Sequence, residues 1–184
     1  MMTKADLPLE METILKKWAE ERLECIGVYK ERTSGYEELA EKIIDDLRSV
    51  YSDKAIELFL KPEKNSVIRS PAAFARITGP CGDTMEIYLE AEKGKIKKAA
   101  FTTDGCDPSI ASGGMAAELA EGRKIEEAGR ITQEDILRGL GRFPEDSLHC
   151  ALLAANTLKK AVEKLLQKTA DKHSDTELQG GSHV

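Results

Sequence analysis

The chain has 184 residues, a formal net charge of −6 at pH 7 and a hydrophobic content of 41%. These values predict one well-packed globular domain with an extension. The acidic balance argues against nucleic-acid binding, because neutralising phosphates needs a clustered excess of Lys and Arg. The longest aliphatic run, 151–155, is far shorter than the roughly 18 residues of a membrane helix, and the first residues contain no apolar signal core. We therefore expect a cytoplasmic protein that binds neither nucleic acid nor membranes.

Two amphipathic helices are predicted near the N-terminus. Apolar residues recur at helical spacing over 9–26, and again over 36–51 after a turn-like Thr-Ser-Gly sequence. Their apolar stripes must be buried. An additional layer packed on the body of the protein is favoured over a partner-binding arm or a dimerisation element. We assign residues 1–49 to a helical N-terminal extension.

The next part of the chain has the pattern of an α+β domain that begins at residue 50. Ser52 is a suitable N-cap for a short helix, which must end before Pro62 because proline cannot continue the hydrogen-bond ladder. Three strand-like segments then follow, at 73–78, 84–90 and 96–103. A charged turn with one glycine separates the last two of them. Three antiparallel strands are expected.

Helix-forming sequence replaces strand-forming sequence after Cys106. Small residues follow this cysteine, an acidic capping box at Thr132 opens a second helix to Leu140, and a long final helix is predicted over 151–166. Strands followed by helices define an α+β domain, which we place at 50–168. The polar residues 169–184 are expected to form a disordered tail.

The four cysteines are expected to be thiols or metal ligands, because nothing in the sequence indicates an oxidising compartment. Cys25 lies within a helical pattern and is expected to be a small buried hydrophobic residue. Cys81, Cys106 and Cys150 instead adjoin Gly, Pro or His at turns or element ends, which are the exposed backbone positions that metal loops require.

Two further side chains lie close to these cysteines in the sequence. Asp83 follows Cys81 by two residues, so both side chains are expected on the same side of an extended segment. His149 precedes Cys150 at the start of the last helix, where the helix dipole favours a thiolate. With Cys106 they supply five candidate ligands, where a tetrahedral ion or a [2Fe–2S] cluster needs four.

Four motifs occur in a fixed order, namely Val50–Lys54 with Leu60–Pro62, Gly79–Asp83, Gly105–Cys106 with Ile110–Ser112, and Leu148–Cys150. In order and spacing they resemble the N-terminal scaffold domain of the IscU/NifU family over roughly residues 50 to 168. The resemblance implies a fold in which a three-stranded antiparallel sheet packs against helices. The helices of residues 1–49 fall outside it.

The resemblance also implies a function, which is that of a non-enzymatic scaffold. Such a scaffold receives sulfur from a cysteine desulfurase, combines it with iron into a labile [2Fe–2S] cluster and passes the cluster to recipient apoproteins. By position, Cys81, Cys106 and Cys150 would be the cluster thiolates, Asp83 the residue that keeps the cluster labile and His149 an alternative ligand. Cys150 would also accept persulfide sulfur. Zinc-loaded forms of the family use the same ligands.

Two alternatives remain open from the sequence. One is a zinc-dependent sulfur acceptor, although the compact interval from Cys106 to His149 and the presence of this histidine argue against that branch. The other is a structural metal-binding module with a closed, four-coordinate ion. The sequence also leaves open a homodimer that shares the cluster between two subunits. Residues 143–147 depart from the Leu-Pro-Pro-Val-Lys segment of bacterial IscU, so transfer through its dedicated Hsp70 chaperone is not expected.

Overall fold

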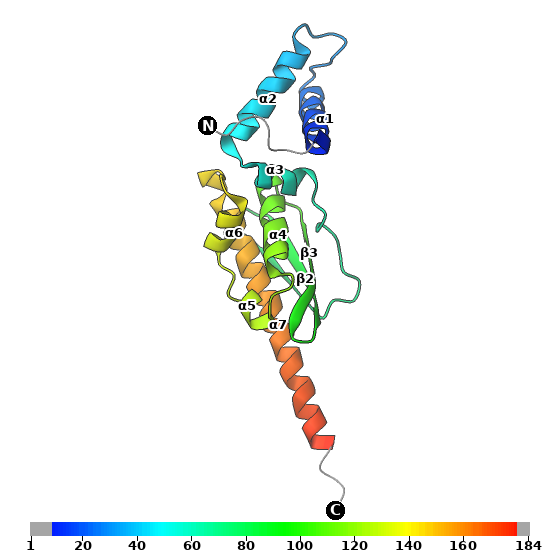
Figure 1. Cartoon of the computed structure of the whole chain (residues 1–184), viewed down its shortest axis with the longest axis vertical. Coiled ribbons are helices and arrows are strands. Elements are labelled where there is room, and N and C mark those ends of the chain that lie inside the picture. The colour runs from blue at the N-terminus through cyan, green and yellow to red at the C-terminus, as the bar shows by residue number, and fades with distance from the viewer. Residues whose placement is uncertain (1–8, 180–184) are drawn as a thin grey trace, which may run out of the picture.

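The computed structural model describes residues 9–179, with side-chain surroundings described up to residue 170. Figure 1 shows a central body, a helical hairpin at one end of it and the end of a long helix that projects at the other. The elements in chain order are α1 (Leu9–Cys25), α2 (Tyr36–Val50), α3 (Asp53–Leu60), β1 (Ala73–Thr78), β2 (Thr84–Glu92), β3 (Lys95–Thr103), α4 (Asp107–Ala120), α5 (Ile125–Ala128), α6 (Gln133–Leu140), a 3₁₀ turn η1 (Glu145–Ser147) and α7 (Leu148–Gln179).

The strands of the described chain form one antiparallel sheet in the order β1-β2-β3. In the first hairpin Thr78 pairs with Thr84, so the loop 79–83 lies at one end of the sheet. In the second, Lys93 and Gly94 both have positive φ, as a two-residue type I′ turn requires. The predicted α+β class and the three antiparallel strands are therefore confirmed. The second and third strands run slightly further than predicted because their ladder continues up to this turn.

Helices α4 and α7 pack on one face of the sheet and enclose the main core. Alternate strand residues such as Ile87 and Phe101 point into this core and are fully buried. Gly113 explains why α4 is rich in small residues, because a Cβ atom there would lie 2.4 Å from the ring of Phe101. The predicted helix of small residues thus allows α4 to approach the sheet closely enough to exclude water.

Local capping signals hold the shorter helices in place. The Oγ of Ser52 accepts a hydrogen bond of 3.2 Å from the backbone N–H of Ala55 at the start of α3. Thr132 and Asp135 form a capping box at the start of α6, in which each side chain accepts a hydrogen bond from the other residue's backbone N–H. Both helices therefore begin where the sequence predicts.

The N-terminal hairpin, which consists of α1 and α2, has a small core of its own formed by Ala19, Leu23, Tyr36 and Ala40. Leu15 is the buried α1 residue that belongs to the main core. The hairpin meets the body beside α3, where Trp18 packs 6.4 Å from Phe59 between ring centroids. The two helices thus pack chiefly against each other, whereas the sequence favours a layer spread over the body.

Two expectations differ from the structure. Helix α7 continues to Gln179, so residues 169–179 are helical where a disordered tail is expected, and no proline or glycine interrupts the sequence there. Residues 180–184 lie outside the described part. Cys25 is exposed, not buried. It follows the buried Leu23 by two residues, which places it on the opposite face of α1. None of the described helices is both long and apolar enough to cross a membrane.

Candidate metal site

Three side chains from separate elements meet at one end of the sheet. Asp83 precedes β2, Cys106 is the N-cap of α4, and Cys150 lies in the first turn of α7. One carboxylate oxygen and the two Sγ atoms all lie within 4.8 Å of one another. Asp83 is half-buried, Cys106 is exposed and Cys150 is 1% exposed, so the group is open on one side and closed on the other. Three of the five predicted ligands are therefore close enough to share one ion.

The loop between β1 and β2 is a tight turn. The backbone N–H of Gly79 donates to the carbonyl of Asp83 at 2.8 Å, and that of Gly82 donates to the carbonyl of Gly79 at 3.1 Å. Gly82 has a φ of 94°, a left-handed conformation that favours glycine. The expectation that Cys81 and Asp83 lie in an extended segment is therefore wrong. Cys81 is exposed on the turn, beside the group of three.

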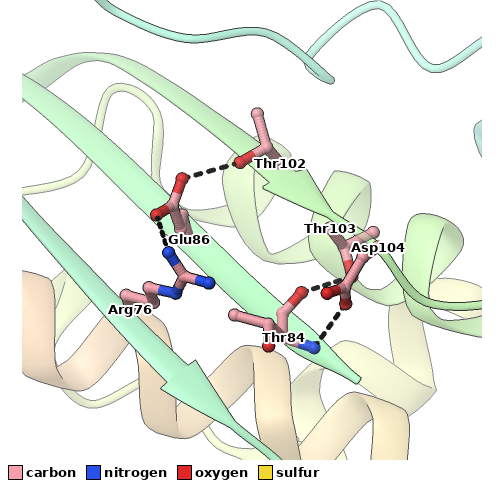
Figure 2. Close-up of a pocket in the computed structure, with 6 residues that line it drawn as sticks. All are labelled: Arg76, Thr84, Glu86, Thr102, Thr103 and Asp104. Atoms are coloured by element: carbon pink, nitrogen blue, oxygen red, sulfur yellow. Dashed lines mark hydrogen bonds and ion pairs between the residues drawn. The ribbon is translucent and has the colours of Figure 1, made fainter. Parts of the chain in front are cut away.

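A polar network fixes the two strand ends that carry Asp83 and Cys106. The N–H of Thr84 donates to Oδ1 of Asp104 at 2.6 Å, while the hydroxyl of Thr103 donates to the carbonyl of Thr84 at 2.8 Å. The N–H of Gly105 donates in turn to the Thr103 hydroxyl at 3.1 Å. Figure 2 shows these side chains at the adjacent ends of β2 and β3. The start of β2 and the approach to α4 are thus held together.

These side chains line a shallow groove together with a second group of polar residues, which pair with one another. Glu86 faces Arg76, with an N–O separation of 3.5 Å, and accepts a hydrogen bond from the hydroxyl of Thr102 (Figure 2). The hydroxyl of Tyr88 also donates to Glu86. Each oxygen of this carboxylate therefore already has a cationic or hydroxyl partner. Glu86 is therefore not a free ligand for the metal site.

The Asp83 side chain is held by close contacts on one oxygen. The buried hydroxyl of Ser109 donates to Oδ2 of Asp83 at 2.7 Å, and Sγ of Cys106 lies 3.9 Å from the same oxygen. A Cβ atom on Gly105 would lie 2.3 Å from it, so only glycine allows this approach. Sequence reasoning missed Ser109. The sequence signal that could have found Ser109 is its position three residues after Cys106, which places both residues on one face of α4.

Burial raises the pKa of the Cys150 thiol to about 11, in the direction opposite to the prediction. Hydrogen bonding with Ser109 offsets part of this effect, whereas the negative charges of Cys106 and Asp83 raise the pKa further. The expected stabilisation of a thiolate by the helix dipole is therefore outweighed by loss of solvent and by like charge. Without a metal, Cys150 is a protonated thiol at neutral pH.

The two remaining predicted ligands flank the group of three. Nε2 of His149 lies 3.6 Å from Sγ of Cys150, and its ring is half-buried. Neither His149 nor Cys81 has its ligand atom within the 4.8 Å group, which is the one such group of three found among the described side chains. Along the chain, His149 directly precedes Cys150, and Cys81 lies two residues before Asp83.

Tyr51, which the sequence pattern assigns to the apolar stripe over 36–51 and to the first motif, is a neighbour of the site. Its ring packs edge-on against Phe59 and Phe143, with centroid separations of 5.5 and 5.7 Å. Burial raises its pKa to about 12, and the nearby negative charges of Asp107 and Cys106 add to the shift. The site is therefore bordered by a cluster of aromatic side chains in which the Tyr51 hydroxyl is neutral.

The donor set indicates which cargo the site can hold. Thiolates are soft ligands that suit zinc and iron–sulfur clusters, whereas magnesium and calcium sites are built from oxygen. A carboxylate among the thiolates binds such a centre less firmly than a further thiolate. The three described side chains thus favour a thiophilic cargo held at a partly open site.

The described chain thus contains an α+β domain whose three-stranded antiparallel sheet carries a candidate metal site of Cys and Asp side chains at one end. Comparison with family models agrees with this class, because residues 50–172 match the model described as the NifU-like N terminal domain. The match covers more than half of the chain. The protein belongs to the IscU/NifU N-terminal family, as its sequence motifs predict.

Individual relatives give the same assignment. The chain is 36% identical over 120 residues to "Iron-sulfur cluster assembly scaffold protein IscU 1" of Archaeoglobus fulgidus, which covers 65% of this chain and 78% of the relative. It is 32% identical over 121 residues to the IscU scaffold protein of Aquifex aeolicus, covering 64% and 77% of the two chains. A crystal structure of a NifU-like N-terminal protein from Brucella abortus shares the fold, with a TM-score of 0.52 and 20% identity over 66% of this chain and 98% of that one.

Proposed function

We propose that this protein is a scaffold on which a labile [2Fe–2S] cluster is assembled from iron and desulfurase-derived sulfur and then passed to apoproteins. The observation that carries the proposal is the convergence of Asp83, Cys106 and Cys150 within 4.8 Å in a member of this family. Relatives with the same domain are named as iron–sulfur cluster assembly scaffolds. The scaffold itself need not be an enzyme, because it holds cargo and turns over no substrate of its own.

Each side chain has a distinct part in this proposal. Cys106 and Cys150 supply thiolates from two helix starts, and the exposed Cys81 supplies a third from the neighbouring turn. Asp83 fills the fourth position with a harder oxygen ligand, which weakens retention and permits release. His149, 3.6 Å from Cys150, is the alternative fourth ligand. Zinc would occupy the same donors in the cluster-free protein.

Cys150 is the proposed acceptor of sulfur from the desulfurase. Its thiolate would attack the outer sulfur of the desulfurase persulfide, the original S–S bond would break, and the desulfurase would leave as a thiolate, with no net oxidation. The thiol is 1% exposed, so the start of α7 must open for the two sulfur atoms to meet. Docking of a cysteine desulfurase would drive this opening in the cytoplasm, and apoproteins would dock later to receive the cluster.

Anaerobic reconstitution with iron, cysteine and a cysteine desulfurase tests the proposal. We expect visible absorption and Mössbauer spectra of a [2Fe–2S] cluster, and a longer cluster lifetime in the Asp83→Ala variant because the labile oxygen ligand is gone. Cys25→Ala is the control, since that thiol is exposed at the end of α1 and has no part in the proposed site. A colourless protein that retains one zinc ion would refute the scaffold and favour the zinc-dependent sulfur acceptor.

A further inference from the structure

Ser109 lies beneath the proposed ligands but is itself no ligand in the family pattern described above. Its side chain is fully buried, and its hydroxyl donates to Oδ2 of Asp83 at 2.7 Å. The same hydroxyl oxygen lies 3.9 Å from Sγ of Cys106. One buried hydroxyl thus touches two side chains of the group of three, on the side away from solvent.

The oxygen of Asp83 that Ser109 contacts is crowded on its other sides. The backbone of Gly105 leaves no room for a Cβ atom beside Oδ2, and Cys106 lies 3.9 Å from it. Ser109 is therefore the hydroxyl donor that fixes the rotamer of Asp83 in the folded protein. Side chains that orient metal ligands in this way commonly contribute 10–100-fold to metal affinity.

We infer that Ser109 is a positioning residue that acts through Asp83 to set how tightly the cluster-free site binds zinc, for which a carboxylate oxygen is an ordinary ligand. Release of an assembled cluster, which Asp83 favours in the proposed function, is a separate property of the same side chain. The inference deepens the proposed function, on which it rests for the identity of the site. The hydroxyl holds the carboxylate towards the two sulfur atoms before cargo arrives, so the site does not have to order this ligand on binding. Without the hydroxyl, Asp83 is free to rotate towards solvent through its half-exposed side.

Ser112 provides a matched control on the same helix. Its side chain is also fully buried, and its Oγ has no hydrogen-bond partner. Replacing either serine with alanine removes one buried hydroxyl from α4, but only the change at Ser109 removes a contact to the site. A difference between the two variants therefore reports the contact with Asp83 and not the loss of a buried polar atom.

The test is zinc binding to the purified full chain, measured by competition with a chelator in the absence of iron, sulfide and desulfurase. We expect Ser109→Ala to weaken zinc binding about 10–100-fold and Ser112→Ala to leave it unchanged. In an Asp83→Ala background, Ser109→Ala should cause no further loss. Cobalt absorption spectra of the two single serine variants should show a changed ligand field for Ser109→Ala and an unchanged one for Ser112→Ala.

Wild-type zinc affinity in Ser109→Ala would overturn the inference, as would an equal loss with and without Asp83. Unfolding curves of the metal-free variants verify the fold. These readouts are independent of cluster assembly. If cluster assembly fails but Ser109→Ala still weakens zinc binding, the inference stands without the proposed function. If cluster assembly is normal but Ser109→Ala binds zinc like the wild type, only the inference is refuted.

Discussion

The guanidinium of Arg22 in α1 lies 3.3 Å from Oδ2 of Asp107, the residue that directly follows Cys106. This ion pair joins the N-terminal hairpin to the helix whose N-cap is a candidate ligand. Both side chains are partly exposed, at 50% and 35%. The N-terminal hairpin therefore reaches the edge of the site through a contact that water and salt can weaken.

Loss of this ion pair should loosen α1 slightly. We expect Arg22→Ala to reduce stability by about 1 kcal/mol or less and to raise amide hydrogen exchange in α1 severalfold. Lys17→Ala is the control, because the ion pair of Lys17 within the described part of the chain is with Glu21 on the same helix. Equal exchange in the two variants would show that the contact with Asp107 does not hold α1.

Leu15 is the main apolar anchor of the N-terminal hairpin on the body. It is 1% exposed and belongs to the main core, whereas Leu9 on the same helix is 84% exposed. We expect Leu15→Ala to lower the free energy of unfolding by about 2–5 kcal/mol, because it leaves a cavity as well as losing buried apolar area. Leu9→Ala should change it by less than about 0.5 kcal/mol. Urea denaturation of both variants compares the two, and similar midpoints would contradict the burial of Leu15.

The reactivity and the stability of the metal-free protein should both depend on Cys150 at alkaline pH. Its pKa is raised from 9.0 to about 11, so alkylation of this thiol should be slow at pH 8 and accelerate as pH rises towards 11. The folded state holds this proton more tightly than the unfolded state does. The resulting stabilisation is therefore present below pH 9 and is lost as pH rises from 9 to about 11.

Site-resolved mass spectrometry of alkylated protein and unfolding curves at several pH values measure these two effects. Cys150→Ala should flatten the pH dependence of stability between pH 9 and about 11. Rapid alkylation of Cys150 at pH 8 in folded, metal-free protein would contradict the burial seen in the structure.

Gly105 should be intolerant of any side chain. A Cβ atom there would lie 2.3 Å from Oδ2 of Asp83 and 2.7 Å from Cβ of Ser109, so Gly105→Ala should displace the carboxylate and weaken zinc binding at least 10-fold. Gly122→Ala is the control: its φ of 77° makes alanine costly by about 1 kcal/mol, but nothing lies within 4 Å of the added atom. Chelator competition measures the loss of zinc affinity, and thermal unfolding measures the loss of stability. Normal zinc affinity in Gly105→Ala would show that Asp83 is not held as described.

Local sequence patterns predicted most of the fold because they act within one element. Proline and the capping residues fix where α3 and α6 begin or end, and the turn at Lys93 and Gly94 fixes the second hairpin. The end of α7 was not predictable in the same way. The polar composition of residues 169–179 favours disorder, yet no proline or glycine interrupts the helix before residue 180.

The candidate site could be predicted only as a set of residues. Spacing located Cys106 and Cys150 at helix starts, as found, but pairing between distant segments determines which ligand atoms meet. The burial of Cys150 and the hydrogen bond from Ser109 depend on how α4 and α7 pack together. A single sequence contains no direct record of that packing, so the sign of the Cys150 pKa shift could not be deduced from the helix dipole alone.

Trp18 is the sole tryptophan of the sequence. Its indole packs against the ring of Phe59 on the body, and the guanidinium carbon of Arg22 lies 5.0 Å from the indole ring centroid. Arg22 also contacts Asp107 beside Cys106. The ultraviolet emission of the protein under tryptophan-selective excitation therefore comes from one chromophore at the junction of the N-terminal hairpin, the body and the site. Its emission can therefore report the approach or departure of the N-terminal hairpin in unlabelled protein.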